Sequence, residues 1–109
     1  GDYVLKELAK VVTTKLIRSN DFFARYGGEE FVLILSGTDQ KIAAEVAERI
    51  RMTIQNHEFV FENKKIPVTI SLGVTSKTVK DTDWNILLER VDKALYTSKQ
   101  TGRNKVTLV

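Results

Sequence analysis

The sequence contains no cysteine and no long hydrophobic run. The count of zero cysteines excludes disulfide frameworks, thiolate zinc sites and cysteine nucleophiles. The longest apolar runs have four or five residues, as at 31–35, so we expect no bilayer-spanning segment and no membrane contact from this chain. No positively charged start precedes an apolar run, which argues against a signal peptide. The chain also lacks an initiator methionine, which suggests a piece of a longer protein.

The composition that remains is ordinary for a folded domain. With 109 residues, of which 42% are hydrophobic and 28% charged, the chain suffices for one domain and is neither disordered nor of low complexity. Its net charge of +3 is too small to demand nucleic acid, so we expect no nucleic-acid partner, while phosphate ligands are compatible. The single histidine, His57, has no second metal-ligand candidate nearby and is predicted to cap a helix or to be solvated.

The spacing of hydrophobic residues predicts three helices and two β-hairpins. Steps of three and four residues predict the helices, with Asp2 as the N-cap of the first one. Alternation and Gly27-Gly28 predict the hairpins. The predicted order is helix 3–18, strands 22–26 and 31–36, helix 39–56, strands 59–61 and 66–75, helix 84–100 and strand 105–109. This order predicts an α+β fold, with helices packed on a central, mainly antiparallel sheet.

Two glycines and two carboxylates meet at the turn of the first predicted hairpin. Gly27 and Gly28 allow a ligand to approach the backbone closely, and Glu29 and Glu30 concentrate negative charge. In an extended segment the two carboxylates point to opposite faces, so only one can face a given divalent cation. The alternative is a solvated acidic hairpin, which is common in sheets. The residues alone leave both interpretations open.

Segment 24–31 reads Ala-Arg-Tyr-Gly-Gly-Glu-Glu-Phe and resembles the signature of the GGDEF-domain diguanylate cyclases, in its GGEEF variant. Further segments match the family in order and spacing, and the resemblance covers essentially the whole chain. These segments are Gly-Asp-x-Val-Leu at 1–5, Ala-Glu-Arg-Ile-Arg at 47–51, Val-Thr-Ile-Ser-Leu-Gly-Val at 68–74, and the stretch 92–104. The resemblance implies the nucleotidyl cyclase or polymerase palm fold, which is ferredoxin-like.

The resemblance also implies a reaction. Two GTP molecules condense into cyclic di-GMP with release of pyrophosphate, as each 3′-hydroxyl attacks the α-phosphate of the other GTP across a two-fold homodimer. Mg²⁺ or Mn²⁺ assists such a displacement. By match to the family, Glu29 is a catalytic residue and the metal ligand, and Glu30 is a second catalytic acid. Gly27 and Gly28 then bind substrate by letting the nucleotide lie against the backbone.

Three further residues match substrate-binding positions of the family. Asp2 corresponds to the residue that reads the guanine edge, a task suited to a carboxylate because guanine presents two neighbouring donors. Lys99 and Arg103 correspond to phosphate-binding cations. Without the resemblance, Asp2 is a helix cap and the two cations are charges favoured at a helix C-terminus.

Arg18 and Asp21 match an inhibitory site of the family, an Arg-x-x-Asp motif with five residues between it and the glycine pair. The resemblance implies that the product, cyclic di-GMP, binds there as an inhibitor, with Arg49 contributing to the same site. Arginine can grip a phosphate with two hydrogen bonds or stack on a guanine. The alternative is a local ion pair between residues three positions apart.

Complete domains of this family carry a helix, a strand with a metal-binding Asp, and a second helix before the part that matches here. We therefore expect residues 1–109 to be a partial GGDEF domain, lacking its first βα portion and inactive in isolation. We expect it to be cytoplasmic, free or attached to a membrane-anchored sensor, and controlled by an upstream sensory or receiver domain. Two alternatives are a catalytically silent receptor for cyclic di-GMP and a structural interaction domain without nucleotide.

Overall fold

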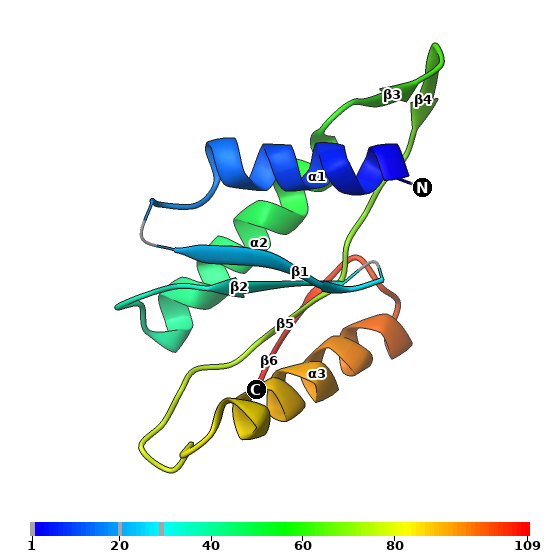
Figure 1. Cartoon of the computed structure of the whole chain (residues 1–109). Helices are drawn as coiled ribbons and strands as arrows, with labels where there is room; N and C mark the ends of the chain where they lie inside the picture. The colour runs from blue at the N-terminus through cyan, green and yellow to red at the C-terminus, as the bar shows by residue number, and fades with distance from the viewer. Residues whose placement is uncertain (1, 20, 29) are drawn as a thin grey trace.

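Figure 1 shows the computed structural model of the chain, which describes residues 2–19, 21–28 and 30–109. The predicted α+β class is confirmed. The helices are α1 (Asp2–Lys15), α2 (Gln40–Asn56) and α3 (Trp84–Gln100). The strands are β1 (Phe22–Gly27), β2 (Glu30–Ile34), β3 (Phe59–Phe61), β4 (Lys64–Ile66), β5 (Leu72–Val74) and β6 (Val106–Leu108).

The helices begin and end largely where sequence signals place them. Asp39 caps α2, its carboxylate accepting a hydrogen bond from the Ile42 N–H at 2.9 Å. His57 is the C-cap of α2, as predicted, and it also bonds Glu7 of α1 at 2.8 Å. The first helix differs from prediction at both ends. Asp2 lies within its first turn, whereas the prediction made Asp2 the N-cap that precedes the helix, and the helix ends at Lys15, three residues early.

The β-strands form three two-stranded sheets among the described residues. β1 pairs with β2 and β3 with β4, both antiparallel, whereas β5 pairs with β6 in parallel. The parallel pair departs from the antiparallel expectation because α3 connects the two strands as a crossover, which brings the chain back in the same direction. Figure 1 shows α3 packed along these two strands.

The predicted single strand 66–75 is divided in two. Its start belongs to β4 and its end to β5, and the stretch 67–71 pairs with no strand among the described residues. Pro67, which follows β4, lacks the N–H that a ladder needs. The predicted alternation nevertheless persists, because Val68 and Ile70 are half-buried against the core while Thr69 is exposed.

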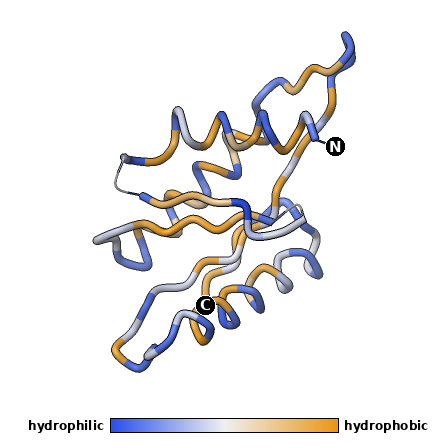
Figure 2. Tube along the Cα trace, viewed as in Figure 1, coloured by the Kyte–Doolittle hydropathy of each residue, from blue (hydrophilic) through white to orange (hydrophobic). Residues whose placement is uncertain are grey.

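The main hydrophobic core lies between α1, α2 and β3, with the β1–β2 hairpin packed against it. Its buried members are Leu8, Val11, Val12, Ile50, Ile54 and Phe59. Figure 2 shows hydrophobic stretches along the hairpin and alternating hydrophobic and hydrophilic stretches along the helices. Burying such side chains stabilises the fold by roughly 1.5–3 kcal/mol each, and the hairpin packs against them through partly buried hydrophobic side chains.

A second packing contact fixes α3 on the β5–β6 pair. A Cβ atom on Gly73 would lie 2.5 Å from the Leu95 nitrogen and 2.6 Å from the Val91 oxygen, so only glycine permits this approach. The buried Ser98 hydroxyl of α3 donates to the Leu72 carbonyl at 2.7 Å. The C-terminal end of α3 is thereby set close to the sheet.

Within the described residues, no helix is both long and apolar enough to cross a membrane.

Candidate functional site

The turn of the β1–β2 hairpin presents open backbone. Gly28 adopts a φ of +54°, a left-handed conformation that glycine tolerates best. A Cβ atom on Gly27 or Gly28 would meet no described atom within 4 Å. The Arg25 Nε donates to the Gly28 carbonyl at 2.6 Å and so supports the turn from its own strand. The predicted metal ligand, Glu29, lies outside the described residues.

The structure brings Glu30 and Lys99 together, although they are 69 positions apart in the sequence. The Lys99 Nζ lies 3.3 Å from the Glu30 Oε2, and the side chains are 31% and 38% exposed. An ion pair this exposed holds its charges weakly, so either partner can exchange the other for a ligand. The pair therefore places one predicted acid and one predicted phosphate-binding cation beside the glycine turn.

The chain reverses its course immediately after α3. The Thr101 N–H donates to the Thr97 carbonyl at 3.0 Å, and the Arg103 N–H donates to the Ser98 carbonyl at 2.9 Å. With Gly102 at a φ of 126°, this is the hydrogen-bond pattern of a glycine-terminated helix. Arg103 is exposed and lies beyond the helix. Lys99 and Arg103 thus occupy one end of α3 but do not share a helical face.

Asp2, the predicted guanine reader, lies at the start of α1. Its carboxylate is exposed and lies 3.8 Å from the Lys6 ammonium group. In the view of Figure 1, the start of α1, the β1–β2 turn and the end of α3 all lie on the right-hand side. That Asp2 shares one site with the turn and the end of α3 stays a prediction.

Arg18 and Asp21 lie at the other end of the hairpin and bind one another. The Arg18 Nη2 and Nε donate to the two Asp21 carboxylate oxygens at 2.9 and 3.3 Å, and the Arg18 backbone N–H adds a bond of 2.8 Å. The Arg18 Nη2 also donates to the Ser36 carbonyl at 2.8 Å and to the Thr38 hydroxyl at 3.1 Å. These contacts form the local ion pair that was the alternative interpretation of the motif.

The hydrogen bonds between Arg18 and Asp21 shift the pKa values of both side chains. The Asp21 side chain is only 2% exposed, whereas that of Arg18 is 55% exposed. Hydrogen bonding to Arg18 lowers the pKa of the Asp21 carboxyl below its ordinary value and raises the pKa of Arg18. Arg49, the third predicted member, lies exposed on α2 and takes no part in the hydrogen bonds of Arg18 and Asp21. The structure thus joins two of the three predicted residues.

The sequence profile of a family described as "Diguanylate cyclase, GGDEF domain" matches residues 1–105. The chain belongs to this family. It is 48% identical over 108 residues to "Diguanylate cyclase A" of Treponema denticola, an alignment that covers 99% of this chain and 29% of that protein. It is 39% identical over 108 residues to "Response regulator PleD" of Caulobacter vibrioides, covering 97% of this chain and 24% of that protein.

Solved GGDEF structures share the fold. The GGDEF domain of DgcB from Caulobacter crescentus, solved in complex with c-di-GMP, has a TM-score of 0.89 and 32% identity, covering 98% of this chain and 63% of that one. The active GGEEF domain of a diguanylate cyclase from Vibrio cholerae has a TM-score of 0.83 and 35% identity, covering 98% and 67%. The chain thus spans less than a third of the two curated relatives named above and about two thirds of these solved chains.

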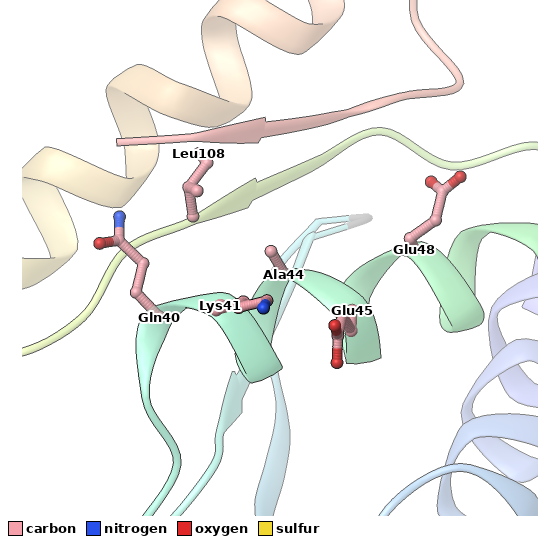
Figure 3. Close-up of a pocket in the computed structure, with 6 residues that line it drawn as sticks. All are labelled: Gln40, Lys41, Ala44, Glu45, Glu48 and Leu108. Atoms are coloured by element: carbon pink, nitrogen blue, oxygen red, sulfur yellow. The ribbon is translucent and has the colours of Figure 1, made fainter.

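The GGDEF chain also contains a shallow groove between α2 and β6, with a volume of about 590 Å³. Figure 3 shows the groove and the side chains that line it, which are Gln40, Lys41, Ala44, Glu45, Glu48 and Leu108. None of the predicted site residues borders it. Among the described residues, no cluster of three or more histidine, aspartate or glutamate side chains could hold a metal. The candidate site is therefore the turn and the end of α3, not this groove.

Two arginines that the sequence prediction did not single out each make several side-chain hydrogen bonds, Arg51 on α2 and Arg90 on α3. Arg90 donates to both Asp81 carboxylate oxygens at 2.8 and 2.7 Å and to the Thr75 hydroxyl at 2.7 Å. This hydrogen bonding lowers the pKa of the buried Asp81. Arg51 of α2 contacts Glu48 and Asn104. The sequence spacing predicts only the contact between Arg51 and Glu48, because these two residues are three positions apart on one helix.

Proposed function

We propose that this chain is the catalytic part of a diguanylate cyclase, which condenses two GTP molecules into cyclic di-GMP and releases pyrophosphate. Membership of the GGDEF family over residues 1–105 is the observation that carries the proposal. The pairing of Glu30 with Lys99 beside an open glycine turn supports it, because an acid and a phosphate-binding cation are held next to accessible backbone.

In the proposed reaction, two chains related by a two-fold axis each hold one GTP. The 3′-hydroxyl oxygen of one GTP bonds to the α-phosphorus of the other, the bond to the pyrophosphate oxygen breaks, and the hydroxyl proton is lost. The same step in the opposite sense closes the ring. The transferred phosphate carries dispersed negative charge, so catalysis depends on positioning and on electrostatic stabilisation.

The chain's own residues divide this work. Lys99 leaves Glu30 and, together with Arg103, donates hydrogen bonds to phosphate oxygens. These hydrogen bonds become stronger as negative charge develops on the phosphate oxygens during the reaction. Gly27 and Gly28 let the phosphate chain lie against the backbone, where the structure leaves space for it. Asp2 accepts hydrogen bonds from the N1–H and N2–H₂ groups of guanine.

The acidic residues of the turn fit a hard divalent cation in chemical type, because Mg²⁺ prefers carboxylate oxygens and is held by one or two of them together with substrate phosphates. Glu30 presents a partly exposed carboxylate there, and Glu29 is its neighbour in the sequence. We propose that Glu29 holds Mg²⁺ or Mn²⁺, with Glu30 beside it. When bound, the cation neutralises the developing charge on the phosphate oxygens.

Cyclic di-GMP is the proposed inhibitor, bound at Arg18, Asp21 and Arg49. The relative DgcB was solved in complex with c-di-GMP, which supports a nucleotide role for this family beyond the substrate. A product phosphate would compete with Asp21 for the Arg18 guanidinium group. A regulatory domain elsewhere in the full-length protein is a further proposal, prompted by a relative named a response regulator.

The test uses the full-length gene product and the 109-residue chain. Each is incubated with GTP and Mg²⁺, and cyclic di-GMP is measured by mass spectrometry. We expect synthesis by the full-length protein, loss of synthesis with a chelator, and recovery with Mg²⁺ or Mn²⁺. No synthesis together with calorimetric binding of cyclic di-GMP would instead support a silent receptor, and neither result would favour a structural domain.

A further inference from the structure

Arg51 of α2 reaches across to the turn that follows α3. Its Nη1 donates to the Asn104 side-chain oxygen at 2.9 Å. Its Nε and Nη2 donate to the two Glu48 carboxylate oxygens at 2.6 and 2.7 Å. The side chain is only 15% exposed. Glu48 thus holds two of the three guanidinium nitrogens of Arg51. The third, Nη1, is shared between Asn104 and the Gln55 side-chain oxygen, which accepts from it at 3.1 Å.

The turn that Arg51 contacts has an unusual backbone. Arg103 and Asn104 follow one another with φ values of 61° and 48°. Side chains other than those of glycine and asparagine seldom adopt this left-handed conformation, and it persists where the surroundings determine it. Asn104 is held from a second side, because its N–H donates to the Ser71 hydroxyl at 3.1 Å. The two contacts together clamp the residue that directly follows Arg103.

We propose that Arg51 is a positioning residue for the phosphate-binding end of α3: by holding Asn104, it fixes the backbone of Arg103. The inference rests on the proposed function, because it takes Arg103 to bind a GTP phosphate. A binding group held in place before the ligand arrives loses less conformational entropy on binding. Arg51 does not itself touch substrate, and its effect is on the affinity for GTP.

A purely structural role for Arg51 makes a different prediction. If the arginine only ties α2 to the rest of the fold, its loss lowers the melting temperature and the fraction of active protein, but leaves the KM for GTP unchanged. If it positions Arg103, the KM rises while kcat changes less. The split between KM and kcat therefore separates the two roles.

The experiment compares Arg51→Ala, Arg51→Lys and Asn104→Gly with the matched control Glu45→Gln in the full-length gene product. Glycine retains the left-handed backbone at position 104 while removing the side-chain acceptor. We expect Arg51→Ala and Asn104→Gly to raise the KM about five- to tenfold, and Arg51→Lys to raise it less. Glu45→Gln removes a carboxylate from an exposed position on the same helix and is expected to change the KM less than about twofold.

The double variant Arg51→Ala with Asn104→Gly tests the route of the effect. Because both changes break the same contact, we expect the double variant to have a KM close to that of the worse single variant. Unchanged KM values, or equal effects of Arg51→Ala and Glu45→Gln, would overturn the inference. Should Arg51→Ala fail to fold, Asn104→Gly and Arg51→Lys decide it. A wild-type protein that neither binds nor converts GTP would instead overturn the proposed function.

Discussion

The two ends of the β1–β2 hairpin differ in how they hold charged side chains. At the turn, Glu30 and Lys99 form a single contact of 3.3 Å and remain about one third exposed. At the open end of the hairpin, where β1 begins and β2 ends, Arg18 donates to Asp21, Ser36 and Thr38. The Asp21 side chain is almost fully buried there. The strand between them spans roughly 17 Å.

The difference separates charges that are available to a ligand from charges committed to the fold. A weak, exposed pair is easily exchanged for a phosphate, whereas breaking a network with a buried carboxylate leaves that carboxylate without its partner. We therefore expect the turn end to govern the rate of the proposed reaction, and the open end to govern stability and, at a higher energetic cost, binding of the product.

The largest expected effect comes from Lys99→Ala at the turn end. Loss of a cation that binds the reacting phosphates is expected to lower kcat/KM about 100-fold, measured from initial rates of cyclic di-GMP formation. Lys93→Ala, an exposed lysine on the same helix, is the control and should leave the rate within about twofold. Similar losses in both variants would show that the pair with Glu30 has no special role.

The next effect tests the open backbone of the turn with Gly27→Ala. Because the added Cβ meets no described atom within 4 Å, the fold should tolerate it. A bound nucleotide would meet it, so we expect the KM for GTP to rise about tenfold while the melting temperature changes by less than about 2 °C.

Gly73→Ala provides the contrast to Gly27→Ala. Its Cβ would lie 2.5 Å from the Leu95 nitrogen, so the melting temperature should fall by on the order of 10 °C. A Gly27→Ala protein that binds GTP as tightly as wild type would contradict close approach of the nucleotide at this turn.

At the open end, Arg18→Ala should affect inhibition and stability more than the initial rate. We expect the concentration of cyclic di-GMP that gives half inhibition to rise about tenfold. The melting temperature should fall by about 5 °C, because three acceptors lose their donor. Lys15→Ala, an exposed residue near the end of α1, is the control. A lower melting temperature with unchanged inhibition would make the pair structural alone.

The smallest expected effect is a dependence of stability on pH. The folded Asp21 has a lowered pKa, so its stabilising effect is full above the ordinary value near 4 and is lost as the pH falls below it. The free energy of unfolding, measured with urea, should therefore decrease between pH 5 and pH 3, a range set by the usual aspartate pKa of about 4. Arg18→Ala should weaken this dependence, and an identical dependence in both proteins would contradict the assigned cause.

Local patterns in the sequence predicted most of the elements. Helical spacing and caps such as Asp39 place α2 and α3, and Gly27-Gly28 places the first hairpin, because these signals act over a few residues. The GGEEF signature predicted the family, which is confirmed over residues 1–105. The roles of individual site residues remain predictions.

Other features could not be predicted because they join distant parts of the chain. Spacing does not show that Glu30 meets Lys99, that Arg51 meets Asn104, or that segment 66–75 is divided between two sheets. It also left open whether Arg18 and Asp21 would face a ligand or one another.

The sequence by itself determined the family, the helices and the glycine turn, because each is encoded by neighbouring residues. Only the tertiary structure decided which charges remain available. The close packing of α3 against Gly73 sets the end of that helix beside the turn, and so brings Lys99 to Glu30. At the open end, the chain after β2 returns to the Arg18 guanidinium group and completes its hydrogen bonds. Contacts of this kind depend on how whole elements pack, which no local pattern specifies.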